Sequence, residues 1–172
     1  MIHDSYDEVY IRGILTAVTS VAIVGASTNA VRPSYFVAKY LAAKGYKVYP
    51  VNPGQAGEEL AGRKVYASLK DIPDPIDMVD IFRNSDAALA ITKDAIAIGA
   101  KVVWMQLTVR NDEAAALAEA AGLQVVMNRC PKIEYGRLSG EIGWAGVNSG
   151  TISSSRGKLG AVGAQNRVLG KQ

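Results

Sequence analysis

The sequence predicts a doubly wound α/β domain, in which a mainly parallel sheet is covered by helices on both faces. Strand-like apolar runs alternate along the chain with helical segments of about 10–15 residues, the pattern of parallel strands joined by right-handed crossovers. A second observation is local. The apolar run Val21–Val24 ends in the small residues Gly25, Ala26 and Ser27 shortly before a helix start, as in the first βαβ unit of a nucleotide-binding sheet.

The first half of the chain is expected to hold two helices and two strands. In order, these are a helix over 7–18, a strand over 20–25, a helix over 33–44 and a strand over 46–51. Apolar residues at helical spacing predict the first helix. Pro33 suits the first turn of the second helix, and Gly45 is a typical stop signal after it. The second strand ends at the turn-forming residues Asn52, Pro53 and Gly54.

The second half continues the alternation after a looser stretch over 54–75. The expected elements are a strand over 76–82, a helix over 85–98, a strand over 101–106, a helix over 112–121 and a strand over 123–127. Asp86 is favourable in a first helical turn, and Gly122 ends the last of these helices. We therefore expect one domain over 1–140, followed by a Gly- and Ser-rich tail over 141–172 that is partly mobile.

Composition excludes several classes of protein. Of the 172 residues, 49% are apolar and 20% charged, which is typical of a globular domain, and the net charge of +3 is too small to favour nucleic acid. No apolar run approaches the roughly 18 residues of a membrane span. The single cysteine, Cys130, excludes an intramolecular disulfide, and the single histidine, His3, leaves no His/Cys metal site. We expect a cytoplasmic protein without a metal, with His3 solvated.

The ends of the predicted strands indicate the class of ligand, because ligands of such sheets lie beyond the carboxyl ends of the strands. A dinucleotide turn reads G-x-G-x-x-G, whereas here Ser27 and Ala30 stand at the second and third glycine positions. Asn52 stands where NAD enzymes place a carboxylate for the ribose hydroxyls. An amide can donate to a ribose phosphate, and the forked guanidinium of Arg32 suits a phosphate group. The pattern favours a ligand with a phosphate on its ribose over NAD.

Several stretches resemble the small bacterial CoA-binding protein family, in the family's order and spacing, over about residues 10–140. The resemblance is strongest in the runs 24–27, 32–35, 37–41, 45–46, 48–53, 62–64, 66–69, 81–83, 99–101, 104–107 and 128–134. It implies a Rossmann-like CoA-binding fold, similar to the N-terminal domain of the succinyl-CoA synthetase α subunit. It also implies coenzyme A or an acyl-CoA as the ligand, and it does not imply a reaction.

The resemblance further implies a role for each matching residue. The implied contacts are the pyrophosphate turn (Gly25, Ala26, Ser27), the phosphate end (Arg32, Pro33), the adenosine ribose (Asn52, Pro53), the far side of the cleft (Phe82, Arg83, Ser85) and the pantetheine arm (Gln106). Phe82 is either a core residue or a stacking surface for adenine. Cys130 is either a buried structural residue or a partner for the CoA thiol.

No catalytic constellation is visible in the sequence. Asp80 lies within an apolar strand, where a hydrogen-bonded core group is expected, and no paired acid and base share a predicted cleft. The first hypothesis is therefore a non-catalytic module that senses or carries CoA. The alternatives are an NAD(P)-dependent oxidoreductase, disfavoured by the missing glycines, and a subunit active only with a partner chain. A homo-oligomer or a protein partner stays open.

Overall fold

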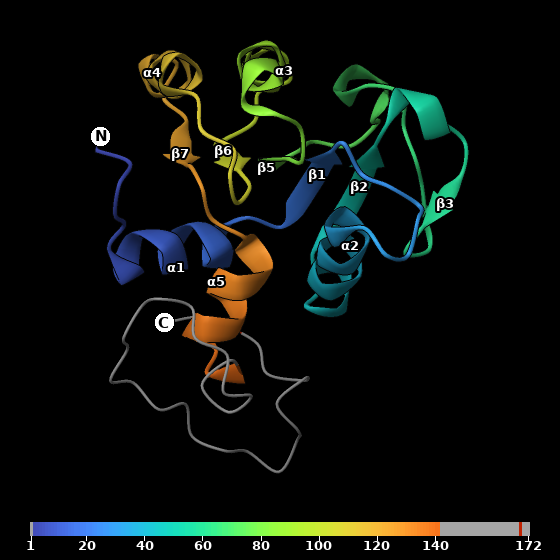
Figure 1. Cartoon of the computed structure of the whole chain (residues 1–172), viewed down its shortest axis with the longest axis horizontal. Coiled ribbons are helices and arrows are strands. Elements are labelled where there is room, and N and C mark those ends of the chain that lie inside the picture. The colour runs from blue at the N-terminus through green and yellow to red at the C-terminus, as the bar shows by residue number, and fades with distance from the viewer. Residues whose placement is uncertain (1, 142–168, 170–172) are drawn as a thin grey trace.

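The computed structural model, which describes residues 2–141 and Leu169, contains a five-stranded parallel sheet (Figure 1). Its strands are β1 (Ser20–Val24), β2 (Lys47–Val51), β5 (Met78–Ile81), β6 (Val102–Met105) and β7 (Gln124–Val126). Their order across the sheet is β2-β1-β5-β6-β7. In this sheet β2 lies on one side of β1, and β5, β6 and β7 lie on the other. The direction of winding reverses between β1 and β5, where a doubly wound sheet opens a crevice.

In the described part of the chain five helices cover the two faces of this sheet, and the sequence predicts four of them. They are α1 (Glu8–Ala17), α2 (Pro33–Ala43), α3 (Ser85–Ala97), α4 (Asp112–Ala120) and α5 (Pro131–Leu138). Helices α3 and α4 lie on one face, and α1, α2 and α5 lie on the other (Figure 1). Each face has its own apolar core, because side chains alternate between the faces along each strand. The doubly wound α/β fold is confirmed.

The looser stretch between β2 and β5 forms short elements. Two 3₁₀ turns span Pro53–Gln55 and Leu69–Asp71, and a small hairpin pairs β3 (Glu59–Leu60) with β4 (Arg63–Lys64). The carbonyl of Pro50 accepts from the N–H of Tyr66, so this segment returns to the end of β2. It therefore packs beside the turn that follows β1.

The observed elements begin and end within about two residues of the expected ones, with one omission. Helix α5 was not predicted, although Pro131 at its first position is a start signal. Within the described residues, no helix is both long enough and apolar enough to cross a membrane. The predicted tail lies outside the described residues apart from Glu141 and Leu169, and the Leu169 N–H donates to the Tyr135 hydroxyl at 2.9 Å.

Candidate functional site

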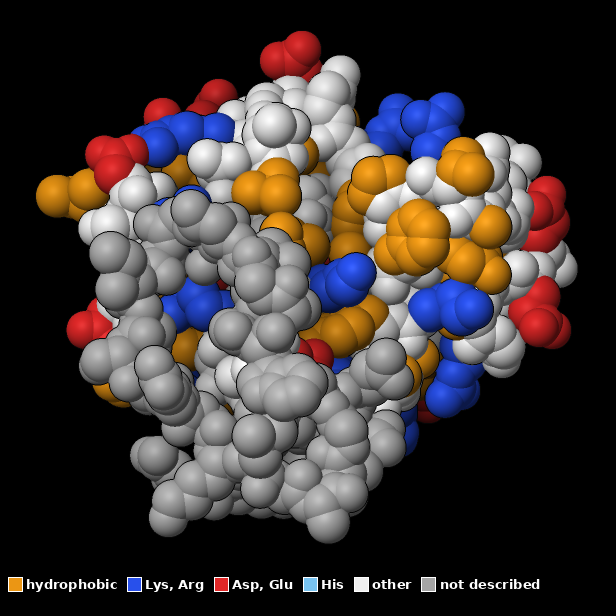
Figure 2. All heavy atoms as spheres, turned by 60° about the horizontal axis from the view of Figure 1, so that its bottom comes forward, with side chains coloured by type: hydrophobic (Ala, Val, Ile, Leu, Met, Phe, Trp, Pro, Cys, Tyr) orange, Lys and Arg blue, Asp and Glu red, His pale blue; other side chains and the backbone are white. Residues whose placement is uncertain are grey.

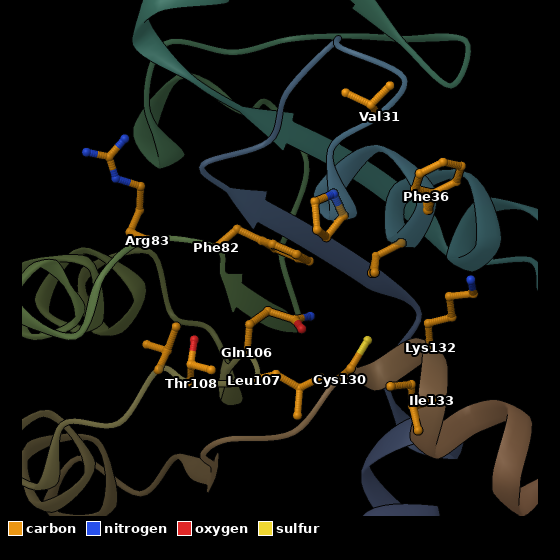
Figure 3. Close-up of a pocket in the computed structure, with 13 residues that line it drawn as sticks. Val31, Phe36, Phe82, Arg83, Gln106, Leu107, Thr108, Cys130, Lys132 and Ile133 are labelled. Atoms are coloured by element: carbon orange, nitrogen blue, oxygen red, sulfur yellow. The ribbon is translucent and has the colours of Figure 1, made fainter. Parts of the chain in front are cut away.

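A cleft of about 540 Å³ opens at the carboxyl edge of the sheet, between the first turns of α2 and α5 (Figure 3). It lies on the face of the sheet that α1, α2 and α5 cover. Its lining residues from the α2 side are Val31, Pro33, Phe36 and Val37; from the strand ends Phe82, Arg83, Gln106, Leu107, Thr108 and Val109; and from the α5 side Cys130, Lys132 and Ile133. Phe82, Gln106 and Cys130 point into the space between the two helices (Figure 3).

The mouth of the cleft exposes large apolar side chains. Val31, Phe36 and Leu107 are 77%, 51% and 47% exposed, so three of the five most exposed large apolar residues described in the chain surround one opening. On the face drawn in Figure 2, apolar side chains gather next to Lys and Arg side chains. Clustered exposed apolar surface is typical of a binding site. The cleft can therefore take a ligand with a substantial apolar part.

The predicted pyrophosphate contacts Gly25, Ala26 and Ser27 lie in a turn over residues 25–29, called the phosphate turn below, which borders this cleft but uses its N–H groups within the chain. The Gly25 and Ala26 N–H groups both donate to the Val51 carbonyl, at 2.9 and 3.2 Å. The Ser27 N–H donates to Ser34 Oγ at 3.1 Å, and the Thr28 N–H donates to the Gln55 side-chain oxygen at 3.1 Å. A phosphate oxygen that bound the Ser27 or Thr28 N–H would therefore have to replace the Ser34 hydroxyl or the Gln55 side-chain amide.

Gly25 is required by the fold itself. Its φ of +88° is one that L side chains rarely adopt, and a Cβ added there would lie 2.6 Å from the Phe82 carbonyl oxygen. The turn after β1 therefore packs directly on the segment after β5. An added Cβ would therefore meet the protein's own backbone before it met a ligand.

Asn52 connects the end of β2 to the phosphate turn. Its Nδ2 donates to the Ala26 carbonyl at 2.7 Å, and its Oδ1 accepts from the Gly54 N–H at 2.9 Å. Pro53 begins the 3₁₀ turn that follows. In this structure Asn52 and Pro53 shape the turn and do not line the cleft.

Cationic side chains stand around the opening. Arg32 is the exposed N-cap residue of α2, and Arg83 is an exposed lining residue whose Cδ lies beside Gly25. Neither guanidinium has an ion-pair partner among the described residues. Lys132 lines the α5 wall, with its ammonium 5.7 Å from the Tyr40 ring centre. The arrangement favours an anionic group near the phosphate turn.

The floor of the cleft contains polar groups over a buried carboxyl. Gln106 Nε2 lies 3.1 Å from each carboxylate oxygen of Asp80, which has no solvent exposure. Burial raises the pKa of Asp80 to about 8, and the hydrogen bond from Gln106 opposes that rise. Burial likewise raises the pKa of the Cys130 thiol. Cys130 therefore stays protonated near neutral pH, which does not favour a nucleophilic role.

The structure brings together only part of the predicted site. Pro33, Phe82, Arg83 and Gln106 line the cleft. The turn residues and Arg32 border it. Ser85, the first residue of α3, does not line the cleft, and its Oγ accepts a hydrogen bond from the Arg110 backbone N–H. Sequence reasoning missed the apolar lining residues, namely Val31, Phe36, Val37, Leu107, Val109 and Ile133, together with Thr108 and Lys132.

The prediction that His3 is solvated is wrong. The side chain is buried, its Nδ1 lies 2.9 Å from the Tyr6 hydroxyl, and its Nε2 lies 3.4 Å from Glu119. Burial lowers the pKa of His3, and the nearby Glu119 carboxylate opposes that effect. His3 is not among the residues that line the cleft. Among the described residues, no three His, Cys, Asp or Glu side chains form a group that could hold a metal ion.

Comparisons with known proteins agree on one family. Residues 19–136, more than half of the chain, match the family model described as CoA binding domain. The uncharacterized protein YneT of Bacillus subtilis (strain 168) is 34% identical over 125 residues, which cover 73% of this chain and 91% of that protein. A solved structure of a hypothetical protein from Pyrococcus horikoshii OT3 superposes with a TM-score of 0.74 at 46% identity, covering 78% of this chain and 94% of that one.

A larger relative contains a similar segment. Subunit alpha of the ADP-forming acetate–CoA ligase I of Pyrococcus furiosus is 38% identical over 88 residues. The match covers 49% of this chain and only 19% of the ligase subunit.

Proposed function

The chain belongs to the CoA-binding domain family, and from that premise we propose that it binds coenzyme A or an acyl-CoA in the cleft between α2 and α5. The observation that supports this proposal most is that the site has a positively charged part and an apolar part. Arg32 and Arg83 stand beside the phosphate turn, and apolar walls continue from there toward α5. CoA has a matching division, because a phosphate-rich nucleotide is joined to a long, uncharged arm.

We further propose that the domain acts as a sensor or carrier and does not itself catalyse a reaction. The described lining residues include no His, Asp or Glu that could exchange a proton with a ligand. The thiol of Cys130 is buried and held protonated. The residues that line the cleft can bind a ligand through shape complementarity, apolar contacts and positive charge.

A second candidate is a CoA-binding subunit that gains activity only with a partner chain. The similarity to one segment of a ligase subunit favours it, because the match covers only 19% of that subunit. Native mass spectrometry of freshly purified protein tests both candidates. A retained mass near that of CoA or an acyl-CoA on the lone chain supports the first, and co-purification of a second protein in fixed ratio supports the second.

Ligand ranking is the first prediction. CoA is expected to bind more tightly than dephospho-CoA, because the 3′-phosphate meets positive charge, and NAD is expected to bind more weakly than either. The Asn52 amide is already bonded to the phosphate turn and offers no carboxylate to a ribose diol. Isothermal titration calorimetry with the three ligands checks the order. Tighter binding of NAD than of CoA would contradict the proposed function.

Arg32→Ala is expected to weaken CoA binding by about 1.5 kcal/mol, near the lower end for a hydrogen bond to a charged group, because the side chain is exposed. Arg32→Lys should recover only part of the loss, since an ammonium lacks the fork. Lys47→Ala is the matched control, because Lys47 is also an exposed cation but begins β2 at the opposite edge of the sheet. Equal affinities of Arg32→Ala and the parent would place Arg32 outside the site.

A further inference from the structure

Asp80 is a carboxyl group in the middle of the central sheet, where an apolar side chain would ordinarily pack. Its neighbours in register are Ile23 on β1 and Trp104 on β6. Its strand neighbours Val79 and Ile81 belong to the core under α3 and α4. Asp80 therefore faces the opposite side of the sheet, toward the cleft. Burying a carboxyl group costs several kcal/mol unless the group is paired. The one hydrogen-bond partner that Asp80 has among the described residues therefore indicates what the carboxyl group is there to hold.

That partner is Gln106, whose main chain is fixed on both sides. The Gln106 N–H donates to the Ile81 carbonyl at 3.3 Å, and the Gln106 carbonyl accepts from the Val109 N–H at 2.9 Å. The side-chain Nε2 lies 3.1 Å from both oxygens of Asp80. The side-chain Oε1 has no hydrogen bond to another described residue, although Gln106 lines the cleft. An amide has one donor end and one acceptor end, so anchoring Nε2 determines what the other end offers.

We propose that Asp80 is a positioning residue that acts through Gln106, holding the amide so that Oε1 faces the cleft as an acceptor for an N–H, O–H or S–H donor on the pantetheine arm. This inference rests on the proposed function. With the Gln106 amide held in this way, the floor of the cleft presents a hydrogen-bond acceptor. A role in holding the amide would also explain why a carboxyl group is buried below the cleft. The ionised carboxylate is the stricter anchor, because it can only accept hydrogen bonds.

The protonation state of Asp80 changes this arrangement in a defined direction. A protonated Asp80 gains an O–H that can pair with Gln106 Oε1, which turns an amide N–H toward the cleft and removes the acceptor. The groups that face Asp80 are Gln106 from the end of β6, the Cys130 thiol from the start of α5, and the apolar Ile23 and Trp104. The Trp104 indole N–H already donates to the Arg129 carbonyl. Binding of the arm should therefore strengthen as Asp80 ionises.

The experiment compares CoA with adenosine 3′,5′-diphosphate, which has the nucleotide phosphates but no arm, and with acetyl-CoA, which has the arm but no S–H. Calorimetric affinities are measured at pH 6.5 and pH 9. The ratio of CoA affinity to adenosine 3′,5′-diphosphate affinity isolates the arm, because titration of the phosphates affects both ligands. For the parent we expect this ratio to rise about two- to tenfold between the two pH values, the range of one neutral hydrogen bond. An equal rise with acetyl-CoA assigns the donor to an N–H or O–H, and a rise with CoA alone assigns it to the S–H.

Variants then separate positioning from a structural role. Asp80→Asn and Asp80→Leu should remove the pH dependence of the ratio and lower it at pH 9 about two- to tenfold, leaving adenosine 3′,5′-diphosphate binding unchanged. Adding Gln106→Leu to Asp80→Leu should cause no further loss, because both act on the same hydrogen bond. Asp77→Asn is the matched control. Asp77 precedes the same strand at the opposite edge and bonds Thr19 and Lys101, so its loss should lower stability without changing the ratio.

Three outcomes would overturn the inference: a ratio that is independent of pH in the parent, an Asp80 variant that keeps the parental ratio, or an equal loss for both ligands. Failure of the parent to bind any of the three ligands refutes the proposed function, and this inference with it. Binding of adenosine 3′,5′-diphosphate with no gain from the arm refutes only the inference.

Discussion

Replacing Gly25 by alanine is expected to lower the free energy of unfolding by about 2–6 kcal/mol. One part of the loss is the strain of a positive φ, about 1–3 kcal/mol for a residue with a Cβ. The other is overpacking, about 1–3 kcal/mol, because the new Cβ would lie 2.6 Å from the Phe82 carbonyl oxygen and 2.9 Å from Arg83 Cδ. Gly25→Val should be worse and should leave little folded protein. Urea denaturation followed by circular dichroism measures the loss.

Two other glycines supply matched controls for the same substitution. Gly45 has φ +94° but nothing within 4 Å of an added Cβ, so Gly45→Ala should show the strain alone. Gly13 lies exposed within α1 with open space around it, so Gly13→Ala should stabilise by about 0.5–1 kcal/mol through helix propensity. If Gly25→Ala costs no more than Gly45→Ala, the turn and Phe82 do not pack as closely as the structure shows.

Much of the fold could be predicted because its signals are local. Helix α2 begins at Pro33 and is followed by Gly45, and both are residues whose backbone preferences act at their own positions. The strands are short apolar runs bounded by such signals. Helix α5 lacked a comparable pattern, since Gly136 interrupts it and its buried residues include the polar Glu134. Its position comes from packing against α1 and α2, which a local pattern does not reveal.

The site was harder to predict for the same reason. The cleft exists because α2 and α5, which are almost a hundred residues apart in the chain, stand over the same strand ends. Phe36 looks like an ordinary helix residue until its exposure beside Leu107 is known. Likewise, the sequence identifies Asn52 and Ser27 as polar residues near a turn, but it does not reveal which groups their side chains hydrogen-bond. Those partners are the Ala26 carbonyl for Asn52 and the Asn29 N–H for Ser27.

Asp80→Asn is expected to stabilise the protein at neutral and alkaline pH. The folded-state pKa of Asp80 is raised to about 8, from an ordinary value of 3.8, chiefly by burial. Between these two values the folded state holds a proton that the unfolded state releases, so the stability that the proton provides is present below about pH 4 and is lost as the pH rises to about 8. The slope approaches 1.36 kcal/mol per pH unit, which sums to roughly 6 kcal/mol over this interval. Asparagine has nearly the same shape and no proton to lose.

The measurement is the difference in unfolding free energy between Asp80→Asn and the parent, from urea titrations at pH 4.5, 6 and 8. We expect this difference to grow in favour of the variant by about 1 kcal/mol or more per pH unit. Taking the difference removes the contributions of the other carboxyls. Asp94→Asn is the control, because the half-exposed Asp94 side chain on α3 has its only ion pair among the described residues with the exposed Lys70, so this variant should show no comparable gain in stability. If the unfolding free energies of Asp80→Asn and the parent changed in parallel with pH, ionisation of the Asp80 carboxyl group in the folded state would cost little free energy. A variant that is more stable yet loses the contribution of the arm to binding would show that Asp80 is kept for the ligand at the expense of stability.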